Sequence, residues 1–514
     1  MTTPGDPRPP DDSLEPYALR EAAFSGVRWV AGSRFVAEIV AFSSAVVLAH
    51  LVSPASFGRA AVALILVVFA TALTGQSLGT PLVQRKILDP GHVRSALTLS
   101  LALGGALSAA TYAAAPATEG IFGAEVVHLA QLMSPVFALS ALGIVPHALL
   151  QRALAFRRIA SAEVGSVVAR SLVSVLLATA GLGAEAIVLG ALAGSGVFAI
   201  VLFAAAPKTM PGWSRPRAAE VLSFGAPAAG VGVLSQMNRN LDYVILGAQV
   251  PSADVGQYWR GYQLGVEYER KLTTIMSRMA LPLFSRARTF EDMRRMRMKM
   301  TRLNAIAVFG VLALFIAVAP TLVPAVFGSA WEPSILPAQL LALAGMAAAT
   351  SSGAAPLVLA AGRPRVLLAM SGAFFFVYRA AIWLAASHGL AAVCIAATAA
   401  HLVRTAALHW LVLDRIIGIP LSDLRRDLVP ATAASLVAGS VAAAAHAGLS
   451  SAALPAALVV GGAVAPAALV YIAVLKVCFV DAWHDVRTML TRVLSRRGRG
   501  PVSGLGPAAS PART

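Results

Sequence analysis

Charged and amide side chains are concentrated in one apolar stretch of the chain, between Phe224 and Arg286. The sequence SQMNRNLDYVILGAQVPSADVGQYWRGYQLGVEYERK there interrupts two hydrophobic segments of membrane-spanning length. A charged side chain in the hydrocarbon of a membrane is costly, and such residues commonly mark the path of a substrate or a coupling ion. The candidates for substrate binding in this stretch are Arg239, Asn240, Arg260, Tyr262 and Arg270, and the candidates for coupling or charge pairing are Asp242 and Glu267.

Some intramembrane charges have a possible neutralising partner on the same helix. Arg34 and Glu38 are four residues apart and therefore share a helix face. Glu267 and Lys271 have the same spacing. Either pair is compatible with mutual neutralisation or with a role in a substrate cavity. Arg34 is therefore a further substrate-binding candidate, and Glu38 a further coupling candidate.

The remaining polar candidates differ in their surroundings. Arg239 is the deepest isolated cation, because it lies near the middle of its hydrophobic segment with an Asn on either side. Tyr262 lies toward the end of the next segment, where an interfacial aromatic belt and stacking on a sugar are both compatible with the sequence. Three further cations, Arg170, Arg379 and Arg404, have no acidic residue within one helical turn and are weaker candidates.

No residue pattern indicates metal or nucleophilic chemistry. The nine His residues are scattered without an HExxH arrangement, and the two cysteines, Cys394 and Cys478, are far apart. The sequence has no GxxxxGK[ST] phosphate loop, which argues against a pump driven by ATP. We therefore predict no catalytic residue, no metal and no cofactor.

Composition identifies the class of protein. Of the 514 residues, 58% are hydrophobic and 13% are charged, with a mean hydropathy of +0.74, so the chain has too few polar groups to cover a water-soluble surface. The formal charge of +17 does not indicate nucleic acid, because the basic residues form short clusters between apolar runs. We predict an all-α polytopic membrane protein.

The apolar runs divide the chain into about 14 membrane spans of roughly 20 residues each. They are Val27–Ala49, Gly58–Pro81, Arg94–Ala115, Val126–Leu149, Ile159–Leu182, Ala186–Ala206, Val221–Val250, Asp254–Leu283, Leu303–Phe327, Leu336–Ala361, Val366–Ser387, Ala391–Leu413, Leu428–Ala447 and Leu454–Val477.

Basic residues alternate between the connections of these spans, as the positive-inside rule requires. Even-numbered connections are basic, for example Arg85 with Lys86 after the second span and RARTFEDMRRMRMKMTR after the eighth. Odd-numbered connections such as HLVSPASF, TEGIFGAE, VPSAD and FGSAWEPS contain neither Lys nor Arg. We therefore predict that both termini are cytosolic. The eighth connection, Arg286–Arg302, is expected to be a loop that anchors on anionic lipid or docks a cytosolic partner.

The spans suggest two lobes, a linker between them and three flanking segments. We expect a disordered cytosolic tail over 1–23, an N-lobe of helices 1–6 over 24–206, a cytosolic linker over 207–220 and a C-lobe of helices 7–12 over 221–413. Helices 13 and 14 over 414–478 and a basic cytosolic tail over 479–514 complete the chain. A weak internal echo supports a repeat, because VVLAHLVSPASFGRA from Val46 to Ala60 aligns without gaps on VILGAQVPSADVGQY from Val244 to Tyr258.

Several blocks of sequence resemble a known family. They are VVLAHLVSPASFGRAAVAL, PHALLQRALAFRRIASAEV from Pro146, LDYVILGAQVPSADVGQYWRGYQL from Leu241 and FGSAWEPSILPAQLLAL near Phe327. In these blocks the chain resembles the polysaccharide transporter branch, the Wzx-type flippases, of the multidrug/oligosaccharidyl-lipid/polysaccharide (MOP) exporter superfamily.

The resemblance implies a MATE-like fold of two pseudo-symmetric six-helix lobes around a central cavity that opens alternately to the two sides. It implies a cargo of polyprenyl-diphosphate-linked oligosaccharide, flipped across a bacterial cytoplasmic membrane for the synthesis of cell-surface polysaccharide or lipopolysaccharide. Guanidinium groups could replace the water that the diphosphate loses, because they bind phosphate oxygens in a bidentate way. Membrane lipids and polysaccharide polymerase or glycosyltransferase machinery are the implied partners; nucleic acid is not.

Two rival functions belong to the same superfamily. A multidrug/cation antiporter usually has twelve spans and an acidic cavity, whereas the intramembrane charge here is mainly basic. A flippase for the peptidoglycan lipid precursor shares the fourteen spans and a cationic cavity. A membrane enzyme acting on lipid-linked sugars would need a sizeable outer loop, and the odd-numbered connections here are short.

Overall fold

The computed structural model describes residues 16–85, 87–284, 287, 289–452 and 454–495. Residues 1–15 and 496–514, which hold most of the two predicted tails, lie outside the described residues. All regular elements of the described ranges are helical, which satisfies backbone polar groups inside each segment as a membrane requires. The predicted all-α membrane fold is confirmed.

The helices follow the predicted order closely. The first half contains α1 (Pro16–Leu51), α2 (Pro54–Thr74), the π-helix η1 (Gly75–Gly79), α3 (Thr80–Gln84), α4 (Pro90–Ala114), the 3-10 helix η2 (Ala115–Thr118), α5 (Glu119–Phe122), α6 (Ala124–Met133), α7 (Val136–Arg152), α8 (Phe156–Thr179) and α9 (Ala184–Ala205). The second half contains α10 (Arg215–Gln249), α11 (Ser252–Gly265), α12 (Glu267–Phe284), α13 (Phe290–Phe327), η3 (Ser329–Ser334), α14 (Ile335–Ala349), α15 (Ala354–Ala360), α16 (Pro364–Ala386), α17 (Leu390–Ala407), η4 (Leu408–Ile417), α18 (Leu421–Ser450), α19 (Ala456–Cys478) and α20 (Val480–Ser495).

Thirteen helical segments of the described chain are long and apolar enough to cross a membrane. Each overlaps one predicted span, in the predicted order, and only the eighth predicted span has no counterpart among them. That span consists of α11 and α12, which are separated by a turn at Val266. The charged residues of α11 and α12 keep this segment from being counted as a span by length and composition. A total of about 14 spans is therefore compatible with the structure.

The predicted loop at Arg286–Arg302 is mostly wrong, because α13 begins at Phe290 and continues for 38 residues. The hydroxyl of Thr289 accepts the backbone N–H of Asp292 at 3.1 Å and so caps the start of this helix. Arg295 lies 3.1 Å from Glu291, one turn earlier on the same helix. The basic segment is therefore a charged extension of a membrane helix.

Contacts divide the chain into two compact units. Unit 1 comprises the described residues of Met1–Gly261, Val323–Pro337 and Phe375–Ala396, and unit 2 those of Tyr262–Leu322, Ala338–Phe374 and Ala397–Thr514. The lobe boundaries at 206 and 221 that the sequence suggests remain a prediction.

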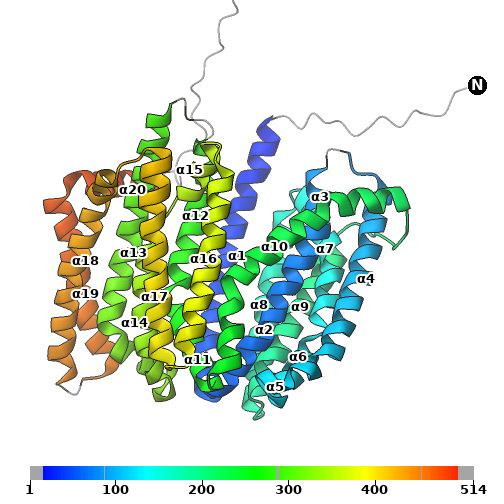
Figure 1. Ribbon diagram of the computed structural model, residues 1–514, viewed down its shortest axis with the longest axis horizontal. Coiled ribbons are helices and arrows are strands. Elements are labelled where there is room, and N and C mark those ends of the chain that lie inside the picture. The colour runs from blue at the N-terminus through cyan, green and yellow to red at the C-terminus, as the bar shows by residue number, and fades with distance from the viewer. Residues whose placement is uncertain (1–15, 86, 285–286, 288, 453, 496–514) are drawn as a thin grey trace, which may run out of the picture. The chain divides into compact units, whose positions relative to one another are not determined.

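In unit 1, α7 packs beside α4 and α9, and α2 packs beside α6, α7 and α9 (Figure 1). Small residues allow this close approach, since Ala and Gly let helix backbones come near each other within a membrane. The first part of α10 lies across the ends of α3 and α4, and the helix then turns to run beside α2 (Figure 1). One core of unit 1 consists of Ala60, Ala63, Ala70, Leu129, Met133, Val136, Phe137, Ala184, Val188 and Ala191.

Two glycines bring the starts of α2 and α11 into direct backbone contact within unit 1. A Cβ atom on Gly58 would overlap the carbonyl oxygen of Ser252, and a Cβ atom on Gly256 would overlap that of Pro54. The same residues correspond in the internal sequence repeat, which aligns Pro54 with Ser252 and Gly58 with Gly256. The two copies of the repeated sequence therefore pack reciprocally on each other.

Further contacts gather odd-numbered connections at this end of unit 1. The indole N–H of Trp331 donates to the carbonyl oxygen of Ala49 at 2.9 Å, and the amide of Gln257 donates to that of Ala330 at 2.9 Å. The ninth connection is thus joined to the first and to the start of the predicted eighth span. These contacts require that the first, seventh and ninth connections share one side of the membrane.

Unit 2 has two buried cores of its own. The core around α13 contains Ala305, Ile306, Val308, Phe309, Leu312, Ala342, Ala349, Ala431, Ala434, Leu475 and Ala482. The other contains Ala280, Phe284, Ala354, Leu357, Val358, Leu408, Val412, Leu413 and Ile419. Trp483 and Val486 of α20 pack against the first core, so the helix that follows the last span is docked on the bundle by its apolar face.

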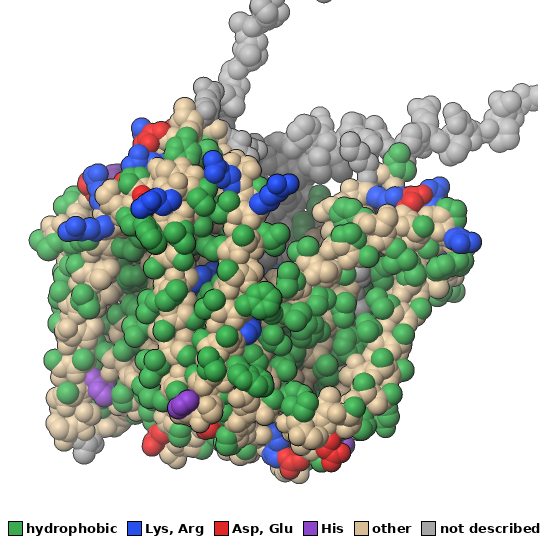
Figure 2. Space-filling view, viewed as in Figure 1, with side chains coloured by type: hydrophobic (Ala, Val, Ile, Leu, Met, Phe, Trp, Pro, Cys, Tyr) green, Lys and Arg blue, Asp and Glu red, His purple; other side chains and the backbone are tan. Residues whose placement is uncertain are grey.

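Figure 2 shows how hydrophobic and charged side chains are distributed on one face of the molecule. Hydrophobic side chains cover most of the visible length of the helices, and Lys and Arg are concentrated toward helix ends. This distribution fits a membrane protein whose basic residues lie at the level of lipid head groups.

We predict that Gly58→Ala and Gly256→Ala each lower the free energy of unfolding by about 1–3 kcal/mol. The reason is that the added methyl group meets a backbone carbonyl that cannot move independently. Gly105→Ala is the matched control, because no atom lies within 4 Å of a Cβ at that helical position. Thermal unfolding of the purified protein in detergent measures the difference. Equal stability of all three variants would contradict the close contact.

Candidate functional site

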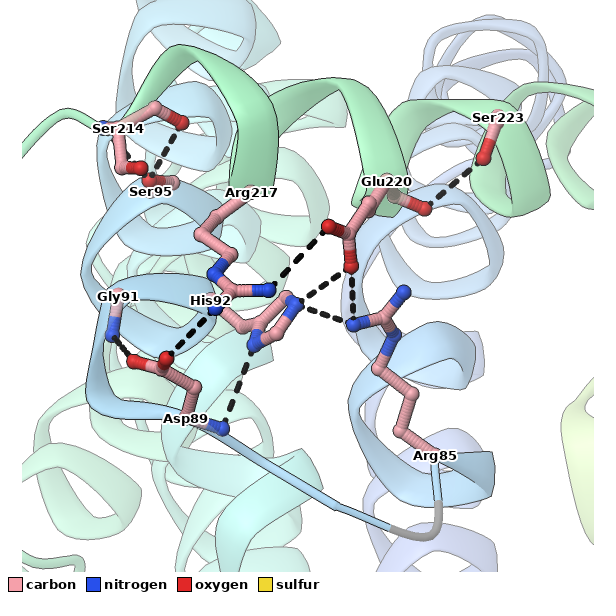
Figure 3. A network of polar contacts seen from close by, with 9 residues as sticks. All are labelled: Arg85, Asp89, Gly91, His92, Ser95, Ser214, Arg217, Glu220 and Ser223. Atoms are coloured by element: carbon pink, nitrogen blue, oxygen red, sulfur yellow. Dashed lines mark hydrogen bonds and ion pairs between the residues drawn. The ribbon is translucent and has the colours of Figure 1, made fainter.

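A polar network holds the start of α10 against the connection between α3 and α4 (Figure 3). The carboxylate of Glu220 lies 2.6 Å from Arg85 Nη1 and 3.0 Å from His92 Nε2, and Arg217 reaches Asp89 at 3.1 Å. The backbone N–H of Gly91, with a smaller contribution from Arg217, holds the pKa of Asp89 below its usual value. The network fixes the start of the helix that carries Arg239, Asn240 and Asp242.

The same network tests the predicted topology. Arg85 and Asp89 belong to the second connection, and Arg217 belongs to the sixth. The guanidinium of Arg152, at the fourth connection, also donates to the carbonyl oxygens of Leu82 and Arg85. Three even-numbered connections therefore meet at one place, as the alternation of basic residues predicts.

Arg239 is held on the surface of α10 by its own helix. Its Nε and Nη2 donate to the side-chain oxygen of Gln236 at 3.0 and 2.7 Å, and its Nη1 donates to Ser235 Oγ at 2.8 Å. Asn240 donates to the backbone carbonyl of Gln236 at 3.1 Å. The guanidinium is exposed, and Gln236 and Ser235 of its own helix orient it.

One turn further, Asp242 lies in a buried cluster that joins three helices. Its Oδ2 accepts the hydroxyl of Tyr258 at 3.0 Å, and the hydroxyl of Tyr258 is 3.4 Å from that of Tyr378. Arg379 interacts electrostatically with Asp242, while its Nη2 donates to the carbonyl of Met237 at 2.8 Å. Asp242 lies on α10, Tyr258 on α11 and Tyr378 with Arg379 on α16, so this cluster connects sequence segments that no local pattern relates.

The cluster is incompletely satisfied. Within the described part of the chain, Asp242 Oδ1 and the Nε and Nη1 of Arg379 make no hydrogen bond, although both side chains are buried. Buried polar groups without partners are costly, and a functional role is one explanation for them. Asp242 therefore remains a good coupling candidate, with Arg379 as its cationic counterpart.

Arg260 has a different environment from the one the sequence suggests for a substrate ligand. Its side chain is 1% exposed, and its guanidinium carbon is 4.3 Å from the ring centre of Phe327 and 4.5 Å from that of Trp331. The rings of Phe57 and Trp259 are each 5.3 Å away. In this conformation Arg260 lies inside an aromatic cage beside the glycine contact and stabilises it by cation–π interactions.

Arg34 is exposed on α1 and forms an ion pair with an acidic residue of another helix. Its Nε is 3.9 Å from Glu163 Oε2 on α8, a loose ion pair that leaves the guanidinium accessible. Glu38 is exposed one turn further along α1. Glu163 was not identified from the sequence, because only neighbours on the same helix can be recognised by spacing.

In unit 2, Glu267 pairs with Arg270 at 2.5 Å, three residues further along α12. The adjacent Glu269 is buried, accepts the hydroxyl of Thr273 at 2.5 Å and interacts electrostatically with Arg404. Arg404 also interacts with Tyr262 in this way, which places that candidate near a cation. The buried Glu269 and the half-buried Arg404 thus form a second acid–base cluster that sequence spacing did not reveal.

No group of three or more His, Cys, Asp or Glu in the described ranges could hold a metal ion. The side chains of the candidate site are mainly guanidinium groups, carboxylates and phenol hydroxyls.

Comparison with known families gives this arrangement a context. Residues 47–336 match the family described as "Polysaccharide biosynthesis protein". The matched range exceeds half of the chain and contains the glycine contact, the aromatic cage and the α10 candidates. The chain belongs to this polysaccharide biosynthesis family. The resemblance to the polysaccharide branch of the MOP superfamily is thereby confirmed.

Two curated relatives have low sequence identity to this chain but match it over about two thirds of its length or more. The lipopolysaccharide biosynthesis protein WzxC of Escherichia coli (strain K12) is 24% identical over 358 residues, which cover 67% of this chain and 71% of the relative. The teichuronic acid biosynthesis protein TuaB of Bacillus subtilis (strain 168) is 21% identical over 388 residues, which cover 72% and 78%. Both matches extend well beyond a single helix pair.

Solved structures agree in fold. The lipid II flippase MurJ in an inward closed conformation aligns with a TM-score of 0.68 at 15% identity, covering 88% of this chain and 99% of that structure. An inward-facing multidrug resistance MATE family transporter of the MOP superfamily aligns with a TM-score of 0.56 at 17% identity, covering 75% and 94%. This member of the polysaccharide biosynthesis family therefore has the MATE-like fold that the resemblance implied.

We predict that Tyr258→Phe lowers the free energy of unfolding by about 1–3 kcal/mol, because it leaves the buried carboxylate of Asp242 without its hydroxyl donor. Tyr112→Phe, which removes an exposed hydroxyl, is the control and should change stability by less than about 0.5 kcal/mol. Chemical unfolding followed by intrinsic fluorescence distinguishes the two. Equal effects would mean that Asp242 has another adequate donor.

Proposed function

We propose that this protein flips a polyprenyl-diphosphate-linked oligosaccharide across the membrane for the synthesis of a cell-surface polysaccharide. It is a transporter and not an enzyme. Membership of the polysaccharide biosynthesis family supports the class of cargo, and the names of WzxC and TuaB refer to surface polysaccharides. The observation that carries the mechanism is the exposed, oriented guanidinium of Arg239 on a helix that is long and apolar enough to cross a membrane.

The diphosphate is the most difficult part of this cargo to move through hydrocarbon, because it loses its hydration. A planar guanidinium donates two parallel hydrogen bonds to phosphate oxygens and remains charged at any physiological pH. Arg239 and Arg34 are both exposed on spanning helices and take this role in our proposal, with Asn240 as an additional donor. Arg270 and Tyr262 are proposed contacts for the oligosaccharide, while Arg260 serves the structure of the aromatic cage.

We place the protein in the bacterial cytoplasmic membrane with both termini in the cytosol. The support is the basic character of the even-numbered connections, three of which meet around the polar network. In this orientation the glycine contact lies toward the outer face. Polymerase or glycosyltransferase machinery would then act on the cargo before or after its transfer.

We predict that Arg239→Ala and Arg34→Ala each slow the flipping of a fluorescent undecaprenyl-diphosphate oligosaccharide in proteoliposomes by about tenfold or more, because a charge-assisted contact to phosphate is lost. Arg363→Ala, which removes an exposed cation from the tenth connection, should flip at the rate of wild type. If wild type moves no lipid-linked sugar but exchanges organic cations for protons or sodium, the antiporter function replaces this proposal.

We further propose that the Asp242 cluster couples transport to a proton gradient. Protonation of Asp242 removes the negative charge that faces Arg379 and changes the attraction among α10, α11 and α16. The unsatisfied oxygen of Asp242 and the unsatisfied nitrogens of Arg379 support this assignment over one in which the cluster is merely structural.

We predict that flipping by wild type responds to an imposed pH gradient and that Asp242→Asn flips at a rate independent of it. The reason is that an amide cannot gain or lose the proton at this position. Asp254→Asn, at a partly exposed acid on α11, should retain the response of wild type. If Asp242→Asn responds to the gradient as wild type does, the coupling group is another acid, and Glu38 and Glu267 are the next to be replaced.

A further inference from the structure

A large groove lies in unit 2 between the start of α18 and the turn from α19 to α20. Its volume is about 1170 Å3, and its walls include Arg302, Arg425, Arg426, Val480, His484 and Asp485. α18 and α19 pack closely along their length, and α20 follows α19 after a single residue. The groove therefore opens where two membrane helices end and an amphipathic helix begins.

The floor of the groove is an ion network that joins three helices. Arg302 on α13 lies 2.8 Å from Asp427 on α18 and 3.2 Å from Asp485 on α20. Lys299 adds a second contact to Asp485 at 2.6 Å. Each of these acids is neutralised by a cation of α13, so the floor itself has no charge left for a ligand.

The wall formed by α18, unlike the neutralised floor, carries positive charge that no acid of the described chain balances. The first residues of this helix read LSDLRRDLV, and both of its acids are engaged by α13, because Asp423 lies 2.6 Å from Arg294 in addition to the Asp427 contact. Arg425 and Arg426 are exposed and form no ion pair with any residue that the structure describes. Two cations therefore face the groove without a partner of their own.

The remaining walls fit a lipid. The apolar side chains of Leu421, Val429 and Val480 are each more than 40% exposed beside the two arginines. One acid, Asp481, also lines the groove, so the two free arginines still leave it net positive. A groove that is cationic at its mouth, apolar along its side and located at the end of membrane helices matches a phosphate head group followed by acyl chains.

We propose that this groove binds the phosphate head group of an anionic membrane phospholipid through Arg425 and Arg426. The proposal does not depend on the cargo of the transporter. The bound phosphate supplies the negative charge that the acids of α18 cannot supply, because α13 has already neutralised them. The lipid also bridges α18 and the turn before α20 across the ion network.

Cys478 provides the measurement, because it lines the groove and is exposed, whereas Cys394 is buried. The full chain is placed in nanodiscs of phosphatidylcholine, alone or mixed with phosphatidylglycerol, and the rate of maleimide labelling of Cys478 is followed. We expect phosphatidylglycerol to slow labelling of wild type. Arg425→Gln with Arg426→Gln should weaken the concentration dependence of this protection by about tenfold or more.

Arg363→Gln with Arg365→Gln is the matched control, because it removes the same charge from exposed positions at another basic connection. This control should be protected as wild type is. Equal loss of protection in the control would overturn the proposal in favour of general surface charge. Equal protection in phosphatidylcholine alone would also overturn it, as would protection of the detergent-solubilised protein by inorganic phosphate to the same extent.

Labelling of Cys394 reports whether a variant has kept its fold, since this thiol reacts only when the surrounding helices open. If the double variant exposes Cys394, the single variants Arg425→Gln and Arg426→Gln replace it in the same assay. Each should then weaken protection by a smaller factor. Unchanged protection in both folded single variants would overturn the proposal.

Discussion

The backbone contact between α2 and α11 is the constraint on which the rest of unit 1 depends. Gly58 and Gly256 allow two helix starts to approach so closely that no side chain fits between them. The nearby aromatic residues can then enclose Arg260, and the first and ninth connections can bond to each other through Trp331 and Ala49. The contact also fixes the start of the helix that carries Tyr258, whose hydroxyl reaches Asp242 on α10. The absence of side chains at Gly58 and Gly256 thus helps to place the hydroxyl of Tyr258 beside Asp242.

The membrane helices could be predicted from the sequence because apolar length is a direct requirement of the bilayer. The placement of even- and odd-numbered connections on opposite sides could be predicted from the alternation of basic residues. Glu220 joins Arg85 and Arg217 of two even-numbered connections, and the contact at Gly58 and Gly256 lies beside two odd-numbered ones. The start of α13 could not be predicted from hydropathy, because a charged helix outside the hydrocarbon has no apolar signal. Its cap at Thr289 and its ion pairs along one face are local features that hydropathy does not measure.

The candidate site was only partly accessible to sequence analysis. The sequence directs attention to Arg239 and Asp242, since charge within an apolar segment is visible without a structure. Spacing cannot find the acid that faces Arg379 or the acid that pairs with Arg34, because each acid lies on a helix distant in the chain. It also cannot tell that Arg260 is enclosed by aromatic rings rather than exposed, since three of the four rings come from other segments. Long-range pairing thus accounts for most of what was missed.

The length of α13 has a mechanical consequence. A helix of 38 residues is about 57 Å long, whereas the hydrocarbon layer is only about 30 Å thick. Its first turns, which carry Arg294, Lys299 and Arg302, therefore form a lever arm outside the hydrocarbon. A small tilt of the embedded part displaces the tip of this arm by a larger amount, and the tip is bonded to α18 and α20. These ion pairs couple α18 and α20 to the tilt of α13, although both helices follow the twelve that are expected to form the lobes.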